Sequence, residues 1–413
     1  MRLGRRLEAG PPRRPWRAGV LGTALVSILA LAAPAWASPT DDRIERSALA
    51  AMRAPALGGD ATLHVRHVAT DATVADDGAL ERQVPASTMK VVTAATALLT
   101  LGEDHRFATR VVEGSSPGRI VLVGGGDPLL TSGDLANLAK RTARKLDRSL
   151  AVTVDVDDFR FPQPTDALGW APGDRPTYAS AVRPLALLGS YSNDTVALAW
   201  SVFIEGLRRN GVDARMGTRV LASDDARRIT IIRPHSLREA VDVMLRVSEN
   251  NVAEVLFRQV ALARGYPATW SGASTAAGEA LRELGIATWR LKLVDGSGLS
   301  GRNRLTAESL TEILDLALAD TRLDALIDGL PVAGRSGTLT NRFAAAPASC
   351  ARGSVAAKTG SLTGVSTLAG VTRGSDGQWR SFAIMVNQRP ASYPSASTSL
   401  AIDTVAAIVQ GCV

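Results

Sequence analysis

The sequence predicts an α+β fold in which an antiparallel sheet is flanked by helices and a smaller β-rich module is inserted. Strand-like segments gather near both ends of the chain instead of alternating with helices, which favours such a segregated arrangement. Turn-rich, strand-like sequence also fills residues 113–191. The chain of 413 residues is longer than one compact core usually holds. We therefore expect a main domain at 38–112 and 192–413 and an inserted module at 113–191.

The first 37 residues predict a signal peptide for export. Six arginines precede an apolar stretch at 20–33, and Ala35-Trp36-Ala37 offers a cleavage site before Ser38. The apolar stretch is shorter than the ~20 residues that a spanning helix needs, and an uncleaved membrane anchor is the alternative. We expect an exported, extracytoplasmic protein that works in the periplasm, in the cell wall or as a secreted enzyme.

The net charge does not indicate a nucleic-acid partner. Residues 1–37 contain six Arg and one Glu, so they carry most of the formal charge of +7 and leave 41 basic against 39 acidic residues. No basic run interleaved with aromatic residues occurs in the remainder. We therefore expect no binding of nucleic acid, and the sequence does not indicate an oligomeric state.

The main domain shows two strand patterns, several helices and a C-terminal sheet. Residues 61–70 alternate apolar and polar side chains as a half-buried strand does, and a second extended segment follows. Apolar positions at helical spacing predict a helix from Ser87 to Gly102. Helical patterns return at 194–210 and 237–263. The C-terminal part predicts three strands joined by short turns, hence an antiparallel sheet, and a last helix, at 354–357, 365–373, 379–388 and 399–409.

Lysine usage indicates where the chemistry lies. The chain has five lysines against forty-two arginines, and two of the five lie in Ser87-x-x-Lys90 and Lys358-Thr359-Gly360. An amine can lose its proton near neutral pH, whereas a guanidinium cannot. Ser87 at a helix start and Lys90 three residues later share one face of the helix. A neutral Lys90 can then accept the proton of the Ser87 hydroxyl, which predicts a nucleophilic serine enzyme.

Three motifs follow one another along the chain: Ser87-x-x-Lys90, Ser248-Glu249-Asn250 and Lys358-Thr359-Gly360. Each is weak alone, because Ser-x-Asn also occurs at helix caps and Lys-Thr-Gly at strand ends. In this order they match a set with a known acyl-transfer chemistry. With them the chain resembles the penicillin-binding proteins and serine β-lactamases, most closely the class C (type-4) D-alanyl-D-alanine carboxypeptidase/endopeptidases. The likeness covers almost the whole mature chain and includes 124–128 and 295–300.

The resemblance implies a penicillin-binding/β-lactamase-like transpeptidase fold and a serine D-Ala-D-Ala carboxypeptidase, with endopeptidase activity left open. It would act on peptidoglycan stem peptides without a cofactor or metal, and β-lactams would be covalent inhibitors. Ser87 would attack the penultimate D-Ala carbonyl with Lys90 as base, Ser248 would relay a proton to the leaving amine, and Asn250 would hold the substrate amide. Lys358 and Thr359 would receive the terminal carboxylate, and the backbone N–H groups of Ser87 and Ser361 would form the oxyanion hole. Gly360 would be a further substrate-binding residue.

Other residues of these phrases are expected to shape the site and not to react. Glu254 is expected to be an ordinary helix residue, because exposed helix carboxylates are common. Asp295 and Ser297 are expected to shape a Gly-rich turn near the site. Glu249 stands where the resembled family usually has Asp, and Gly301 where it has Arg. The geometry of the substrate loop is therefore the part that the resemblance determines least.

The two cysteines, Cys350 and Cys412, are expected to form a disulfide, because an exported chain meets an oxidising compartment. Two separate buried thiols are the alternative. The bond would attach the C-terminal helix to the strand region that carries Lys358. Neither cysteine has a histidine nearby in the sequence, and the chain has four His, so neither a metal site nor a cysteine nucleophile is expected.

Two other functions stay open from the sequence. A β-lactamase would share the fold and the motifs, but it needs a group that activates the deacylating water, and no Glu-x-x-Leu-Asn sequence follows Asn250. A non-catalytic, cell-wall-binding scaffold would keep the fold without turnover, although all the motif residues are present. Mutation of Ser87 discriminates between a scaffold and a peptidase, since a scaffold would keep its biological role in Ser87→Ala and a peptidase would lose it.

Overall fold

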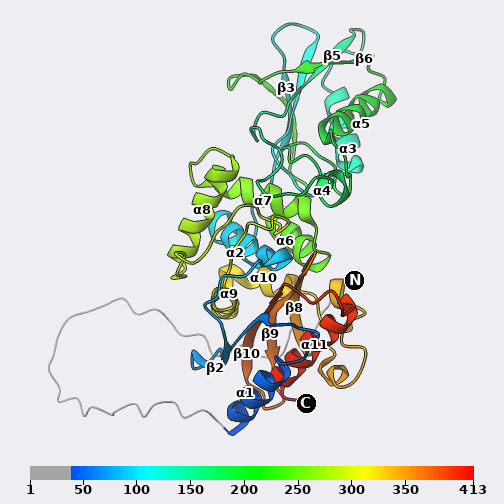
Figure 1. The fold of residues 1–413 in the computed structure, drawn as a ribbon. Coiled ribbons are helices and arrows are strands. Elements are labelled where there is room, and N and C mark those ends of the chain that lie inside the picture. The colour runs from blue at the N-terminus through cyan, green and yellow to red at the C-terminus, as the bar shows by residue number, and fades with distance from the viewer. Residues whose placement is uncertain (1–38) are drawn as a thin grey trace, which may run out of the picture.

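The computed structural model describes residues 39–413, so the expected signal peptide at 1–37 lies outside the described residues. In the described part, no helix is both long and apolar enough to cross a membrane. The protein has two sheets with a helical layer between them, which makes the molecule elongated (Figure 1). One sheet contains strands from both ends of the described chain, and the other contains strands from its middle.

The first sheet is antiparallel throughout, as the sequence predicts. Its strand order is β2-β1-β10-β9-β8. The N-terminal hairpin joins the C-terminal strands through β1 and β10, which pair from Asp60 with Asn387 to His67 with Arg380. The strands of this sheet are β1 (Asp60–His67), β2 (Ala72–Asp77), β8 (Val355–Leu362), β9 (Val365–Arg373) and β10 (Trp379–Asn387).

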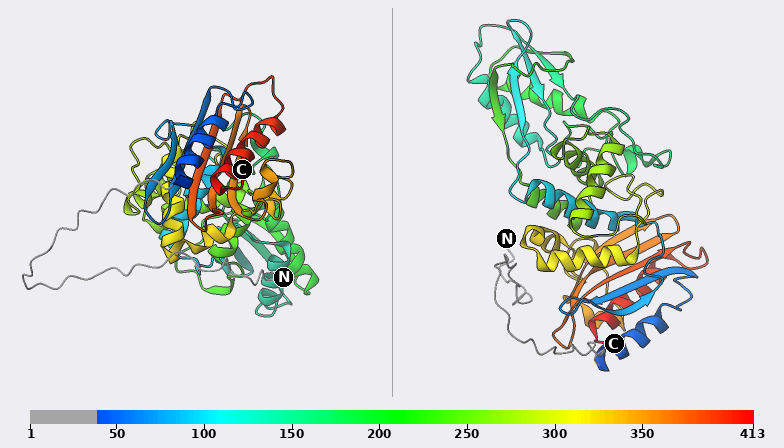
Figure 2. Two further views of the ribbon diagram at one scale, coloured as in Figure 1. Left: turned by 90° about the horizontal axis from the view of Figure 1, so that it is seen from below. Right: turned by 90° about the vertical axis from the view of Figure 1, so that its left-hand side faces the viewer.

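Four helices cover the two faces of this sheet, α1 (Pro39–Ala51) and α11 (Ser395–Gln410) on one side and α2 (Met89–Leu101) and α9 (Ala307–Ala319) on the other (Figure 2). Successive residues of a strand point to opposite faces. Leu368 and Phe382 accordingly pack in the core that contains α1 and α11, whereas Ala369 and Ala383 pack in the core that contains α2 and α9. Both faces of the central strands are therefore buried.

Helix α2 runs through the helical layer. Residues 89–98 are all buried, so the helix is covered on every side. Gly102 ends it with φ +78, a conformation that favours glycine. The expected helix from Ser87 to Gly102 is confirmed, with a 3-10 turn as its beginning. The other helices and short turns of this layer are η1 (Ala86–Thr88), α6 (Leu237–Arg246), α7 (Asn250–Ala263), α8 (Trp270–Glu283), η2 (Thr321–Leu323) and α10 (Asp324–Gly329). The short turn η3 (Gly337–Leu339) lies against β8, and its Leu339 packs in the core that contains α1 and α11.

The second sheet is mixed and lies at the opposite end of the molecule from α1 and α11 (Figure 1). In the order β6-β5-β4-β3-β7, β5 pairs parallel with both β4 and β6, while β3 pairs antiparallel with both β4 and β7. Two helices, α3 and α5, share an apolar core with it. This part of the chain comprises β3 (Thr109–Glu113), β4 (Arg119–Val123), α3 (Ser132–Ala143), β5 (Val152–Asp157), α4 (Asp174–Thr177), α5 (Thr195–Arg209), β6 (Ala214–Arg219) and β7 (Arg228–Ile232).

The second sheet differs from the expected module in two respects. Helix α3 lies in a segment expected to be strand-like, where Thr131 caps the helix by accepting a hydrogen bond from Asp134 N. The sheet also continues past residue 191 to Ile232, so α5 packs on it. The amphipathic pattern of α5 shows that one face is buried but not against which sheet. The strands that pair here thus lie on both sides of the expected boundary.

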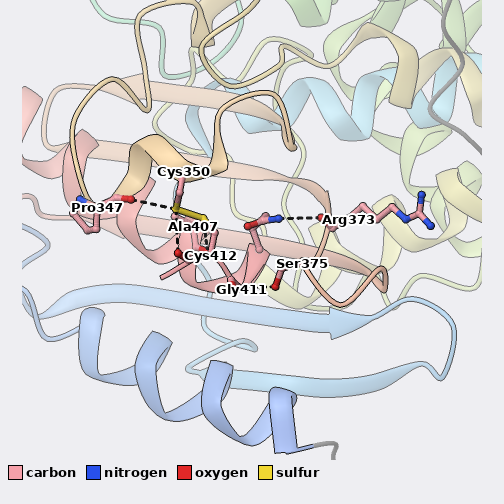
Figure 3. Close-up of a disulfide and its surroundings, with 8 residues drawn as sticks. Pro347, Cys350, Arg373, Ser375, Ala407, Gly411 and Cys412 are labelled. Atoms are coloured by element: carbon pink, nitrogen blue, oxygen red, sulfur yellow. Dashed lines mark hydrogen bonds between the residues drawn. A yellow bond between two sulfur atoms is a disulfide. The ribbon is translucent and has the colours of Figure 1, made fainter.

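A disulfide attaches the end of α11 to the segment before β8 (Figure 3). Cys350, in the short helix η4 (Ala348–Ala351), bonds to Cys412, with 6.0 Å between the two Cα atoms. This confirms the expected pairing. Ser375 Oγ also donates a hydrogen bond to Gly411 O at 2.9 Å, so the turn after β9 holds the same end of α11.

Candidate active site

Ser87 lies in a strained turn at the start of α2. Ala86, directly before it, has φ +47, a left-handed conformation that residues other than glycine adopt rarely. Packing holds this turn, because Ala86 is fully buried and a Cβ at Gly298 would lie 1.8 Å from Ala86 O. Ser87 itself is only partly buried. The turn therefore presents the Ser87 side chain at the border of the core, one helical turn before Lys90.

Lys90 is fully buried and contacts residues from three parts of the chain. Its Nζ lies 3.1 Å from Ser87 Oγ, as expected for two side chains on one face of a helix. The same Nζ lies 2.7 Å from Asn250 Oδ1 and 2.8 Å from Ser297 O. Two of the three sequence motifs thus meet at this amine.

Burial lowers the pKa of Lys90 to about 8, because the charged amine loses its hydration in the core. The negative charges of Glu254, Asp295 and Glu249 act in the opposite direction and raise this pKa. A lysine with such a pKa has a sizeable neutral fraction near neutral pH, unlike an exposed lysine. Lys90 can therefore accept a proton under ordinary conditions.

The second motif forms a break between α6 and α7. The sequence predicts one helical stretch over 237–263, and the structure divides it at Ser248, whose φ is +62. Glu249 then caps α7 by accepting a hydrogen bond from Val252 N at 2.8 Å, so the longer side chain still caps the helix. Tyr191 OH donates a hydrogen bond to Glu249 Oε1 at 2.8 Å. The break turns the Ser248 side chain toward the first sheet.

Lys358, on β8, joins the third motif to the second. Its Nζ lies 2.9 Å from Ser248 Oγ and 2.8 Å from Thr359 O. Burial lowers the pKa of Lys358 well below its ordinary value, and the charge of Lys90 lowers this pKa further. The Thr359 hydroxyl donates a hydrogen bond to Thr338 Oγ1 at 2.8 Å. The site therefore contains two buried amines, each beside a serine hydroxyl.

Gly360 allows β8 to lie directly against the turn that carries Ser87. A Cβ at this position would lie 2.1 Å from Thr367 Oγ1, 2.8 Å from Pro85 O and 3.0 Å from Ser87 N. Two of these atoms belong to the backbone, so a side-chain movement alone makes no room. Thr367 Oγ1 donates a hydrogen bond to Pro85 O at 2.9 Å and fastens the turn to the sheet. The next residue, Ser361, is exposed and continues the strand beyond this contact.

Asp295 is buried and shapes the turn that carries Ser297, as expected. It accepts hydrogen bonds from Gly298 N and from Trp170 Nε1, each at 2.9 Å. The contribution of Ser297 to the site is its backbone carbonyl, which contacts Lys90. Sequence reasoning missed this contact, because a carbonyl group is common to every residue and gives no signal in a motif.

A groove of about 940 Å³ opens at the ends of β1, β2 and β10. Val84 and Thr363 line it, close in sequence to Ser87 and Ser361, but no residue of the three motifs does. Among residues 39–413, no group of three or more His, Cys, Asp or Glu side chains is placed to hold a metal ion. The groups that the site offers are hydroxyls, amines and a carboxamide.

Comparison with known sequences relates almost the whole chain to one peptidase family. The sequence pattern of the D-Ala-D-Ala carboxypeptidase 3 (S13) family matches residues 46–188 and 186–407. Carboxypeptidase DacB of Mycolicibacterium smegmatis is 35% identical over 438 residues, which cover 98% of this chain and 90% of the relative. A D-alanyl-D-alanine carboxypeptidase of an Actinomadura species is 29% identical over 493 residues, which cover 93% of this chain and 91% of the relative.

Comparison with solved structures agrees with the expected fold. The crystal structure of penicillin-binding protein 4 from Haemophilus influenzae superposes with a TM-score of 0.74 at 21% sequence identity and covers 85% of this chain and 95% of that chain. The same protein in complex with a β-lactam has a TM-score of 0.69, also at 21% identity, and covers 88% of this chain and 98% of that chain. The penicillin-binding/β-lactamase-like fold predicted from the sequence is therefore confirmed.

Proposed function

This chain belongs to the D-Ala-D-Ala carboxypeptidase 3 (S13) family, and from that premise we propose an exported serine carboxypeptidase that trims peptidoglycan stem peptides through an acyl-enzyme on Ser87. The family gives the reaction, which is hydrolysis of the bond between two D-alanines. The contacts of Lys90 support the choice of the reacting residues. Export is supported by the signal-like sequence at 1–37, which lies outside the described residues.

The observation that carries the proposal is the set of three polar atoms around Lys90 Nζ. A neutral amine has two N–H donors and one lone pair. Asn250 Oδ1 at 2.7 Å and Ser297 O at 2.8 Å are acceptors without a proton to give, so they take the two N–H groups. The lone pair is then left for the third neighbour, the Ser87 hydroxyl at 3.1 Å. This is the arrangement that a base needs to take the proton of a nucleophile.

Acylation follows from this geometry. Ser87 Oγ attacks the carbonyl of the penultimate D-Ala while its proton moves to Lys90, which gives a tetrahedral oxyanion and a charged lysine. When the C–N bond breaks, the Ser248 hydroxyl gives a proton to the leaving amine and recovers one from Lys358. Lys358 in turn takes the proton that Lys90 received, so Lys90 is neutral again. Free D-alanine leaves and an ester on Ser87 is left. Water, deprotonated by Lys90, then hydrolyses the ester and restores the Ser87 hydroxyl.

Residues of β8 and Asn250 bind the substrate. Lys358 and Thr359 receive the terminal carboxylate, and this negative charge raises the depressed pKa of Lys358 so that the amine binds it in the charged form. The backbone N–H groups of Ser87 and Ser361 point to the oxyanion, since Gly360 brings the two segments together. Asn250 holds the substrate amide. The remainder of the stem peptide leads past Ser361 toward the groove at the end of β8.

A β-lactam contains a strained amide that Ser87 would attack in the same way, and we propose that such drugs inhibit the enzyme covalently. The complex of Haemophilus influenzae penicillin-binding protein 4 with a β-lactam supports this extension. Rapid release of the drug would require a group that activates water behind the ester. The second motif region has two acidic side chains. Glu249 caps α7 and accepts a hydrogen bond from Tyr191 OH, and Glu254 is fully buried with both oxygens bonded to backbone N–H groups. We therefore favour slow release over a β-lactamase.

The experiment that tests the proposal is the release of D-alanine from a synthetic peptide ending in D-Ala-D-Ala. The purified protein is expected to release one D-alanine per peptide, and the Ser87→Ala variant none. Ser201→Ala, which removes an exposed hydroxyl from α5, is the matched control and is expected to keep full activity. A peptide ending in L-Ala-L-Ala should resist the enzyme. Undiminished release by Ser87→Ala would show that Ser87 is not the nucleophile.

A further inference from the structure

Glu254 is a buried carboxylate of α7 that binds the turn behind Lys90. We expected an ordinary helix residue here, but its exposed fraction is 0%. Its Oε2 accepts a hydrogen bond from Gly296 N at 2.8 Å, and its Oε1 accepts one from Ser297 N at 3.0 Å. One carboxylate therefore binds two successive peptide N–H groups, an arrangement that favours its ionised form.

The turn that Glu254 binds is the one that carries the carbonyl next to Lys90. Ser297 O accepts a hydrogen bond from Lys90 Nζ at 2.8 Å. On the same turn, Thr93 Oγ1 donates a hydrogen bond to Gly296 O at 2.6 Å. A Cβ at Gly296 would lie 2.5 Å from a backbone oxygen of α7, so the turn also packs directly on that helix. The Ser297 carbonyl is thus fixed relative to α2.

Two acceptors decide where the lone pair of neutral Lys90 points. Asn250 Oδ1 is held because Asn250 Nδ2 donates a hydrogen bond to Tyr178 O at 2.7 Å. Ser297 O is held by the turn that Glu254 binds. If either acceptor moved, the amine would rotate and the lone pair would leave the line to the Ser87 hydroxyl. Burial of the Glu254 carboxylate costs free energy, and the fixed orientation of the Lys90 amine is what the protein gains in return.

We propose that Glu254 is a positioning residue, which aims Lys90 at Ser87 by fixing the Ser297 carbonyl and which adds a negative charge behind the amine. The proposal rests on the proposed function, because it presumes that Lys90 is the base for Ser87. Glu254 touches neither the substrate nor the reacting atoms. Its effect is carried by the two peptide groups of the turn and by its electrostatic field.

The charged groups that interact with Glu254 are Lys90 of α2, Arg258 of α7 and Asp295 of the loop before α9. Glu249, which caps α7, and Lys358 of β8 interact with Lys90. Burial and then the charge of Asp295 raise the pKa of Glu254, whereas the hydrogen bonds from Gly296 N and Ser297 N lower it and favour the ionised form. In return, the charge of Glu254 raises the pKa of Lys90 against the effect of burial. Removal of this charge therefore lowers the pKa of Lys90 and extends its neutral form to lower pH.

The test measures the second-order rate constant for acylation by a labelled penicillin between pH 5.5 and 9.5. In Glu254→Gln, the amide keeps one acceptor oxygen but its NH₂ cannot accept, so one bond to the turn is lost. We expect the rate constant to fall about 10- to 100-fold at high pH. We also expect the acid limb of the pH profile, the range in which the rate constant falls as the pH decreases, to move about one unit to lower pH. Glu205→Gln, an exposed carboxylate of α5, is the matched control and is expected to leave both unchanged.

The Glu254→Asp variant distinguishes the effect of the position of the carboxylate from the effect of its charge. It also tests the proposal if Glu254→Gln fails to fold. It keeps the negative charge but is one methylene shorter, so the rate constant should fall while the acid limb stays where it is. A wild-type rate and acid limb in folded Glu254→Gln would overturn the proposal. A fall in melting temperature and rate with an unmoved acid limb in Glu254→Gln would also overturn it, because structural support alone explains that result. Absence of acylation in the unaltered protein would instead refute the proposed function itself.

Discussion

Lys358 Nζ lies 2.9 Å from Ser248 Oγ, although 110 residues separate the two in the chain. Ser248 belongs to the helical layer and Lys358 to the first sheet, so this contact crosses the boundary between them. Ser87, in η1, and Lys90, in the first turn of α2, lie at the same boundary. The candidate site therefore exists only when the sheet and the helical layer are packed together, and changes at that interface are expected to affect stability and chemistry jointly.

Replacement of Lys90 by arginine should abolish acylation without removing the positive charge. A guanidinium keeps its proton, so it cannot act as base, and the rate constant should fall about 10²- to 10⁴-fold. The measurement is acylation by a labelled penicillin. Lys140→Arg, on the exposed side of α3, is the matched control and should react at the wild-type rate. A folded Lys90→Arg protein that acylates normally would exclude Lys90 as the base.

The rate of acylation should rise with pH through the pKa of Lys90. Burial lowers this pKa to about 8. Only the neutral amine can accept a proton, so protonation of Lys90 at lower pH removes the base. The rate constant should consequently fall about tenfold for each pH unit below 8 and level off above it. Stopped-flow or quenched acylation across this range measures it. A rate independent of pH between 6 and 9 would contradict the assignment.

Gly360→Ala should destabilise the protein and impair acylation together. The added Cβ would lie 2.8 Å from Pro85 O and 3.0 Å from Ser87 N, so β8 must move away from the turn. We expect a loss of about 1–3 kcal/mol in the free energy of unfolding. Gly278→Ala in α8 is the control with the opposite sign, because its nearest neighbour is a side-chain atom at 3.7 Å and the helix gains about 0.5–1 kcal/mol.

Denaturant unfolding of both glycine variants, with the acylation rate of each, checks this expectation. An unfolding free energy of Gly360→Ala equal to that of the unaltered protein would mean that β8 does not lie against the Ser87 turn. A stabilised and fully active Gly278→Ala would show that the effect depends on position and not on glycine itself.

Loss of the disulfide should lower stability but not chemistry. The bond between Cys350 and Cys412 closes a loop with a sequence separation of 62. The chain-entropy model gives a contribution of about 4 kcal/mol for such a loop. The bond lies on the side of the first sheet covered by α11, whereas Ser87 lies on the side covered by α2. The double variant Cys350→Ser/Cys412→Ser should therefore unfold at lower denaturant concentration yet acylate at the wild-type rate while folded.

Much of the fold followed from local pattern. The strand at 61–70, the helix from Ser87 to Gly102 and the three C-terminal strands are confirmed, because alternation and helical spacing record burial directly. The second sheet was harder to predict. Its strands β6 and β7 are short, and β6 is largely exposed, so neither shows a clear pattern. From its sequence pattern, α5 could pack on either sheet. The long-range pairing of the strands determines which sheet it covers.

The candidate site also has a part that the sequence predicts and a part that it does not. The sequence predicted the side chains of the three motifs, since their chemistry depends on residue type. The positive φ of Ser248 and the contact of Ser297 O with Lys90 are backbone properties that residue type does not encode. For Glu254 the sequence predicts an ordinary helix residue, because a carboxylate in a helix is usually exposed, whereas in the structure the turn at 296–297 covers it.

The most direct measurement of the central claim is intact and peptide mass spectrometry of the purified protein after incubation with a labelled penicillin, with Ser87→Ala alongside. The account predicts one adduct per chain, located on Ser87, slow to leave and absent from the variant. An adduct on another residue, or one that forms equally in Ser87→Ala, would contradict it. Rapid turnover of the drug without an adduct would indicate a β-lactamase instead of a carboxypeptidase.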